Sequence, residues 1–149
     1  MQIKTKYLGE VIIKEEDIIS FPTGIPGFVE ETKFTILDFP GNETFQFLQS
    51  VHTPGLVFVI TDPYQFMKAY TFKLDQTFLE QLHIRHEGDV VVRSIVTLRE
   101  PFSESTLNLK GPLIINAQKN IGKQYIINED DFPVKAPISS FLISKGGEA

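Results

Sequence analysis

The stretch TFQFLQSV, residues 44–51, divides into two sets of side chains when every second residue is taken together. An extended chain would carry Phe45, Phe47, Gln49 and Val51 on one side, and Gln46, Leu48 and Ser50 on the other. A period of two over eight residues indicates a β-strand with two different faces. The segments around it decide what kind of sheet this strand joins.

Other apolar segments are short, rich in β-branched residues and separated by turn residues. LVFVIT, residues 56–61, is apolar throughout, as a strand covered on both faces would be. Further strands are expected at 12–21, 33–39, 69–74, 89–99, 105–110, 112–117 and 123–128. Many short strands at this spacing favour an antiparallel barrel or sandwich. We therefore expect an all-β protein with minor α content, folded as a compact antiparallel β-barrel-like single domain.

Helical signals are few, and they predict one or two short helices. Asp62-Pro63 fits an N-cap followed by proline at the first helical position. Residues 76–84 place apolar side chains on one helical face. We expect the barrel domain to cover residues 1–130. The segment 131–149, with two prolines and a Gly-Gly pair, is expected to be a loosely ordered C-terminal tail.

The stretch FPTGIPGF, residues 21–28, raises the possibility of a phosphate-binding loop. Such a loop needs a following helix N-terminus and a Gly-Lys-Ser/Thr ending, and this one is followed by Glu30 and Glu31 instead. Glycines that tolerate positive φ beside prolines that fix φ indicate a stiff connection. Gly24, Pro26 and Gly27 are therefore predicted to form a structural turn between two strands.

Composition excludes several classes of protein. The chain has no cysteine, so disulfides and thiolate chemistry are absent. Its net charge is −5, of which −4 falls in residues 1–75, and it has no cluster of Lys and Arg. Direct nucleic-acid binding is not expected, because such binding depends on neutralising phosphates. No apolar run is long enough to span a membrane, and no secretion signal is seen, so we expect a cytoplasmic protein with no membrane contact.

No set of residues predicts catalysis, a metal site or a cofactor. His83 and His86 are three residues apart near the end of an expected helix, which is not the spacing of a helical zinc pair, and they are interpreted as surface residues. Adjacent carboxylates point apart on a strand, so they do not form an acid–base pair. We expect no enzyme. A small-molecule-binding β-barrel and an uncharacterised hydrolase remain the alternatives.

Aromatic and polar side chains at strand ends are the remaining candidates for a functional site: Tyr64, Phe66, Glu100, Phe102 and Asn116. They could be core aromatics and loop-capping polar groups. They could also be anchors of a protein-binding patch. We take the second interpretation as the hypothesis for partner binding.

Taken together, three segments resemble one family, the flagellar assembly factor FliW. They are FPTGIPGF, LQSV…PGLVFVITDPYQF, and LREPFSESTLNLKGPLIINAQKNIGKQ. They come in the order and at the spacing of that family, and the resemblance covers residues from about 3 to 128. Beyond residue 130 the tail offers no usable match.

The resemblance implies a β-barrel-like protein without enzymatic activity that binds two partners. One is the RNA-binding translational repressor CsrA, which FliW sequesters away from the flagellin message. The other is flagellin itself, which captures FliW as it accumulates and so frees CsrA to repress translation. The resemblance also implies a chaperone-like role in guarding flagellin before export.

The acidic composition suggests how CsrA would be inhibited. Because CsrA must present basic surface to RNA, an acidic partner docked beside that surface would repel RNA. The residues expected to form this acidic rim are Glu15, Glu16, Asp17, Glu30 and Glu31. Screening limits the effect to about 8 Å at physiological salt, so the rim would have to lie close to the path of the RNA.

Overall fold

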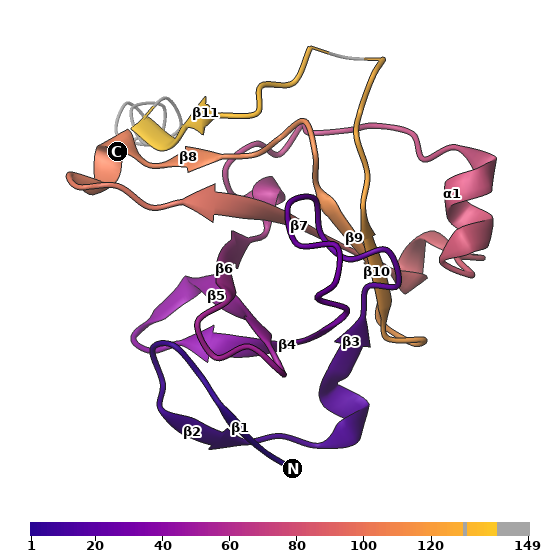
Figure 1. Ribbon diagram of the computed structural model, residues 1–149. Coiled ribbons are helices and arrows are strands. Elements are labelled where there is room, and N and C mark those ends of the chain that lie inside the picture. The colour runs from indigo at the N-terminus through magenta and orange to yellow at the C-terminus, as the bar shows by residue number, and fades with distance from the viewer. Residues whose placement is uncertain (130, 140–149) are drawn as a thin grey trace.

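The computed structural model describes residues 1–129 and 131–139 (Figure 1). The strands are β1 Gln2–Lys4, β2 Glu10–Ile12, β3 Ile18–Ser20, β4 Lys33–Phe39, β5 Asn42–Ser50, β6 Val57–Thr61, β7 Val90–Thr97, β8 Thr106–Leu107, β9 Leu113–Asn116, β10 Ile121–Gln124 and β11 Ala136–Pro137. One α-helix, α1 Gln76–Gln81, and four 3-10 turns, η1 Glu15–Asp17, η2 Pro63–Gln65, η3 Glu87–Asp89 and η4 Phe102–Glu104, complete the described elements. The predicted all-β class with minor α content is confirmed.

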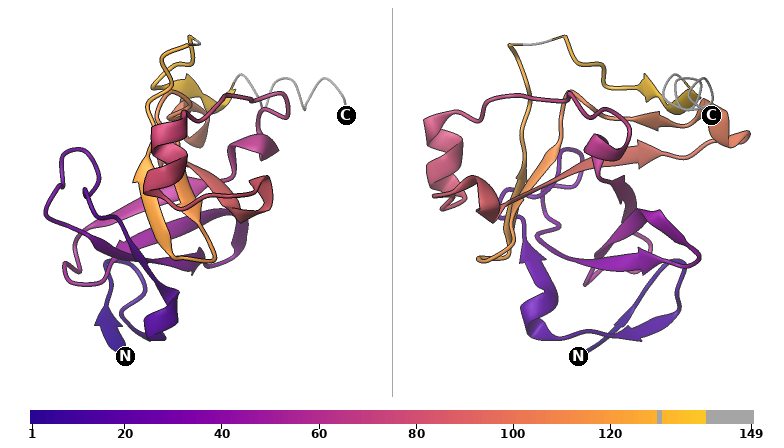
Figure 2. Two further views of the ribbon diagram at one scale, coloured as in Figure 1. Left: turned by 90° about the vertical axis from the view of Figure 1, so that its right-hand side faces the viewer. Right: turned by 180° about the vertical axis from the view of Figure 1, so that it is seen from behind.

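The central sheet closes on itself as a ring of strands (Figures 1 and 2). Its order runs β7, β6, β5, β4, β3, β10, β9, and β9 pairs back with β7. Neighbours are antiparallel except β3 and β10, which pair in parallel through Ser20 and Ile121. β8 and β11 extend outward from β7, and β1 pairs with β2 as a separate hairpin. The expected barrel is therefore present as an approximate, barrel-like ring.

Large apolar side chains fill the interior of the ring. Leu48 on β5 lies opposite Ile36 on β4 and Phe58 on β6, so one face of the sheet is continuous across three strands. The side chains with no exposed surface in this cluster are Phe21, Phe34, Leu48, Ile60 and Leu113. A ring filled in this way is a packed core, which does not favour the small-molecule-binding alternative.

Alternate residues of the same strands face outward, where later segments of the chain cover them. Phe45, Val96 and Ile114 belong to this second core, together with Phe78 from α1. Residues 69–74, expected as a strand, run along this core without joining the sheet. Tyr70 fixes that segment, because its buried hydroxyl donates a hydrogen bond to the Leu109 carbonyl at 2.5 Å. The apolar residues of 69–74 therefore pack on the outer core, and the segment does not pair with a strand.

The two ends of the described chain cover different parts of the ring. Near the N-terminus the expected strand 12–21 is divided among β2, η1 and β3. The tail was expected to begin at residue 131. Within 131–139, however, β11 pairs with β8, and Ala136 and Ile138 are buried against the outer core. The rest of the expected tail, 140–149, lies outside the described residues. Figures 1 and 2 show β8 and β11 at the opposite end of the molecule from the β1–β2 hairpin.

Candidate partner-binding surface

The loop between β7 and β8, residues 98–105, displays Phe102 at the surface. Phe102 opens η4 and is 43% exposed. Ser105, which is buried, holds the loop in place: its hydroxyl oxygen accepts a hydrogen bond from the Arg99 backbone N–H at 2.8 Å. Its carbonyl accepts another from the Ile138 N–H at 2.9 Å. Phe102 is thus an exposed ring on a supported loop.

Phe45 brings two of the predicted residues together. Its ring lies edge-on to Phe102, with centroids 5.8 Å apart, and stacks with Phe66 at 6.4 Å. Phe66 follows η2, which begins where the Asp62 carboxylate accepts a hydrogen bond from the Tyr64 backbone N–H at 2.9 Å. The predicted N-cap at Asp62 is therefore present, and the turn that it starts leads to Phe66, which stacks on Phe45.

These rings continue across the sheet in a series that we call the aromatic chain. Phe45 contacts Phe39 at 6.2 Å, Phe39 stacks on Phe47 at 4.7 Å, and Phe47 stacks on Tyr7 at 5.4 Å. The members of the aromatic chain are Tyr7, Phe39, Phe45, Phe47, Phe66 and Phe102. Tyr7, at one end, is 59% exposed. Sequence reasoning missed Tyr7, because nothing in TKYLGE links it to a strand about forty positions later.

Tyr64 and Glu100 border the aromatic chain without joining it. Tyr64 is half-buried and packs on Tyr70 with ring centroids 5.6 Å apart. Burial, and secondarily the charge of Asp62, raise the pKa of the Tyr64 hydroxyl. Glu100 is exposed two residues before Phe102. A partner that covers Phe102 would therefore meet a carboxylate at its edge.

Asn116 does not lie with these residues, and its predicted role as a contact residue needs correction. Its side chain is 1% exposed. The amide nitrogen donates to the carbonyls of Leu82 and His83 at 2.9 and 3.1 Å, and the amide oxygen accepts from the backbone N–H groups of Gln118 and Lys119. A side chain that bonds four backbone groups inside the fold is a structural link and not a partner anchor.

The expected acidic residues do not form one continuous rim. Glu15, Glu16 and Asp17 are all exposed in η1, directly before β3. Glu30 and Glu31 precede β4, which runs antiparallel to β3. The two groups therefore lie at opposite ends of a three-residue strand, roughly 10 Å long at 3.4 Å per residue. Because screening reaches only about 8 Å, one end can act on a charged neighbour without the other.

The carboxylate of Glu31 accepts hydrogen bonds from two side-chain hydroxyl groups, whereas that of Asp17 accepts one from the backbone N–H of Lys14. Glu31 accepts hydrogen bonds from the hydroxyl of Ser50, at 2.9 Å, and from the hydroxyl of Thr53. These bonds, first from Thr53 and then from Ser50, hold the pKa of Glu31 below its usual value. Glu31 thus stays charged while it supports the loop between β5 and β6.

The Gly/Pro stretch connects neighbouring strands β3 and β4, as the turn interpretation requires. Gly24 and Gly27 have φ values of +68° and +90°. The Phe21 N–H donates to the Thr32 carbonyl at 2.8 Å and closes the base of the loop. A Cβ added to Gly24 would lie 2.5 Å from the Cα of Val29, so only glycine fits there.

The two histidines that the sequence singled out lie at the surface. His83 and His86 are both exposed. In the part of the chain that the structure describes, no group of three or more potential ligands could hold a metal ion. Within residues 1–129 and 131–139, none of the helices is long and apolar enough to cross a membrane.

Comparisons with known proteins point to one family. The family model for the FliW protein matches residues 2–138. The flagellar assembly factor FliW of Oceanobacillus iheyensis is 49% identical over 146 residues, which cover 98% of this chain and 99% of that protein. The FliW of Bacillus subtilis strain 168 is 44% identical, covering 93% of this chain and 96% of its own. A crystal structure of the flagellar assembly factor FliW superposes with a TM-score of 0.86 at 40% identity, covering 93% of this chain and 96% of that one.

Proposed function

Because the chain belongs to the FliW family of flagellar assembly factors, we propose that it is a non-enzymatic regulator that binds two proteins in turn. One partner is the translational repressor CsrA, and the other is flagellin. Binding to CsrA keeps the repressor off the flagellin message. Accumulating flagellin then competes for the regulator and restores repression. This exchange takes place in the cytoplasm.

The observation that carries this proposal is the aromatic chain and its exposed end at Phe102. Aromatic side chains supply much of the energy at protein–protein interfaces, because they bury a large area and lose little conformational freedom. Phe102 is exposed, while the buried ring of Phe45 packs edge-on against it and is itself stacked with Phe66. A ring presented from a held loop suits an anchor that enters a pocket on a partner.

The charge of the protein supports a particular form of inhibition. Glu15 and Glu16 are exposed next to β3, and Glu30 is exposed at the other end of that strand. With CsrA bound nearby, these carboxylates would lower the electrostatic potential around the RNA-binding surface without filling it. We propose that this repulsion contributes to inhibition beside any steric effect.

A reconstitution from purified components tests the exchange. CsrA is first bound to a fluorescent RNA that carries the flagellin leader, and RNA release is followed by anisotropy as the regulator is added. We expect release at stoichiometric regulator and rebinding of the RNA when flagellin is added. The Phe66→Ala/Phe102→Ala variant should release the RNA only at higher concentration.

The control variant is Ile126→Ala, which removes an exposed apolar side chain outside the aromatic chain and should behave as wild type. The proposed function would be overturned if the wild-type protein failed to bind CsrA or failed to bind flagellin. Full activity of the double variant would retain the function but move the contact surface elsewhere.

A further inference from the structure

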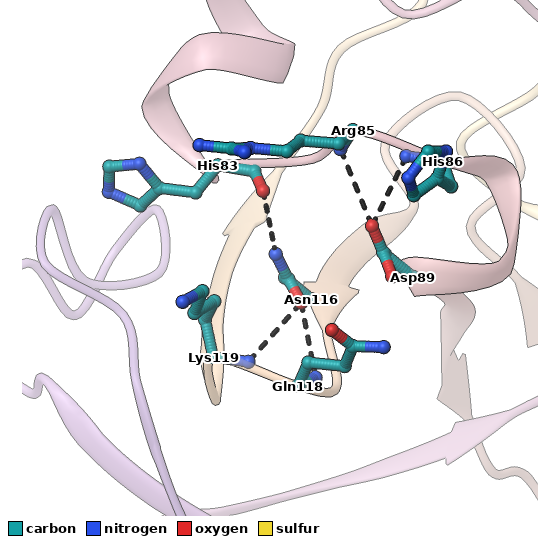
Figure 3. Close-up of a pocket in the computed structure, with 7 residues that line it drawn as sticks. All are labelled: His83, Arg85, His86, Asp89, Asn116, Gln118 and Lys119. Carbon is teal, nitrogen blue, oxygen red and sulfur yellow. Dashed lines mark hydrogen bonds between the residues drawn. The ribbon is translucent and has the colours of Figure 1, made fainter.

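A second surface lies between the residues that follow α1 and the turn that joins β9 to β10. It is an open pocket of about 570 Å³ lined by His83, Arg85, His86, Asp89, Asn116, Gln118 and Lys119 (Figure 3). We call it the cationic pocket. None of its residues belongs to the aromatic chain, and the function proposed above does not use them.

The two cations of this pocket are Arg85 and Lys119. No hydrogen bond or ion pair joins the Arg85 guanidinium or the Lys119 ammonium group to any residue that the structure describes. Both residues are exposed. In the view of Figure 3, the side chains of Arg85, His83 and Lys119 extend to the same side of Asn116. Because neither the Arg85 guanidinium nor the Lys119 ammonium group has an acceptor among the described residues, both can bind an anion.

Two buried polar side chains fix the backbone beneath these cations. Asn116 links the end of α1, through the carbonyls of Leu82 and His83, to the backbone N–H groups of Gln118 and Lys119. The Asp89 carboxylate accepts from the Arg85 and His86 N–H groups at 3.4 and 3.1 Å. His83 is held at a φ of +55°, which a non-glycine residue seldom adopts without such support. The backbone that carries the two cations is therefore fixed in position.

The chemistry of the pocket favours one class of ligand. A guanidinium group matches the geometry of a carboxylate, which it can bind through two parallel hydrogen bonds. A compact, multiply charged anion such as phosphate would also feel the Asp89 carboxylate at the other side of the pocket. An extended acidic segment can place separate carboxylates at Arg85 and Lys119 and leave Asp89 uncovered. Nucleic acid is disfavoured, because the chain as a whole carries a net charge of −5.

We propose that the cationic pocket binds an acidic segment of a partner protein, with carboxylates held by Arg85 and Lys119. The site is separate from the aromatic chain, so a partner can engage it independently of Phe102. A partner long enough to reach both surfaces gains affinity from each, because the second contact is formed within an existing complex.

Fluorescence anisotropy of labelled hexaglutamate, titrated with the purified full-length protein, tests this proposal. We expect saturable binding in 50 mM salt that weakens as salt is raised, because exposed charges are increasingly screened. The Arg85→Gln/Lys119→Gln variant should bind roughly tenfold more weakly, as expected for two partly solvated ion pairs. Its melting temperature should stay close to that of wild type, since neither side chain has a partner in the described fold.

A matched control separates local contacts from the field of the whole protein. Lys4→Gln/Lys135→Gln removes the same two charges from exposed positions outside the pocket, and it should bind hexaglutamate within twofold of wild type. Equal binding by both double variants, or no binding by the wild-type protein, overturns the proposal. Labelled hexathymidylate and inorganic phosphate serve as further probes. Binding of either one in place of hexaglutamate also overturns it, because the pocket would then select phosphate.

Discussion

Two loops of the molecule each display one phenylalanine in nearly the same way. Phe28, in the Gly/Pro turn, is 45% exposed and lies edge-on to Phe58 at 5.7 Å. Phe102, in the loop after β7, is 43% exposed and lies edge-on to Phe45 at 5.8 Å. Exposure and local geometry therefore do not distinguish them. What lies behind each ring does.

Behind Phe28 is the interior of the ring, and behind Phe102 is the outer aromatic chain. Phe58 packs against the filled interior cluster, whose members are held inside the sheet. Phe45 instead connects Phe102 to Phe66 on one side and to Phe39 on the other. The first ring covers the interior core, whereas the second covers the outer core, against which the partly buried Phe39 and Phe66 also pack. The two loops therefore differ in the core that each phenylalanine covers, and this difference is the basis for proposing Phe102 as the partner contact.

The largest effect should come from the backbone of the Gly/Pro turn. Gly24→Ala adds a Cβ at 2.5 Å from the Val29 Cα in a residue whose φ is +68°, so steric overlap adds to backbone strain. We expect it to lower the free energy of unfolding by about 3 kcal/mol or more. Gly27→Ala meets only strain, because no atom lies within 4 Å, and should lower it by about 1–2 kcal/mol.

Urea denaturation measures both values, and Gly55→Ala, at a position with open space and no positive φ, should change little. Both turn variants should keep their partner affinity under conditions in which they remain folded. Equal losses for Gly24→Ala and Gly27→Ala would mean that the loop moves freely to accept a Cβ. Lost affinity with unchanged stability would make the Gly/Pro turn a contact surface.

The next effect tests the two phenylalanines directly. Phe102→Ala should weaken the binding of CsrA or flagellin by about 2 kcal/mol, because it removes an anchor from the aromatic chain. Phe28→Ala removes an equally exposed ring and should change the affinity by less than about 0.5 kcal/mol. Titration calorimetry gives the affinities, and thermal unfolding shows whether each variant is folded. Similar losses in both variants would remove the distinction drawn between the loops.

A smaller effect is expected from the acidic groups at the two ends of β3. Glu15→Lys/Glu16→Lys and Glu30→Lys change exposed charges at opposite ends of that strand. If repulsion inhibits CsrA, the variant nearer the RNA path should let the CsrA complex regain RNA affinity, by up to about tenfold. RNA affinity is measured at saturating regulator and one fixed salt concentration. If every variant that still binds CsrA blocks RNA as fully as wild type, inhibition is steric or conformational.

The sequence predicted those features that depend on neighbouring residues. Alternation in 44–51 predicted β5, because opposite faces of that strand meet the interior and the outer core. The N-cap at Asp62 and the positive φ of Gly24 likewise depend on local chemistry. Contacts between distant segments could not be predicted in this way. Tyr7 reaches Phe47 only because the β1–β2 hairpin folds over the ring, which no local pattern specifies.

Asn116 shows the same limit for a polar residue. An asparagine after an apolar strand has the same sequence signature whether its amide points outward or bonds to another segment. Here the amide of Asn116 points inward because it donates hydrogen bonds to the carbonyls of Leu82 and His83, which directly follow α1. The same link assembles the cationic pocket, whose residues come from two segments that only the fold brings together. A single sequence therefore does not predict in which direction a polar side chain at a strand end points.

The smallest effect concerns Glu31, which couples the Gly/Pro turn to the loop after β5. Hydrogen bonds from Thr53 and Ser50 lower the pKa of Glu31 in the folded protein. A carboxyl group with a lowered pKa contributes stability that is fully present above its unfolded value, near pH 4.5. That contribution is lost as the pH falls through the folded value. Because Glu31 is partly solvated, it should amount to less than about 1 kcal/mol.

Urea denaturation at a series of pH values from 7 to 3 isolates this contribution by comparing wild type with Glu31→Gln. The variant lacks the charge at every pH, so the difference in unfolding free energy should be largest at neutral pH and shrink below pH 4.5. Glu30→Gln, at the exposed neighbouring position, serves as the control and should keep the same pH dependence as wild type. A constant difference between wild type and Glu31→Gln across the series would show that the carboxylate acts through packing alone. A shrinking difference would instead show that its charge holds the Gly/Pro turn to the loop that contains Ser50 and Thr53.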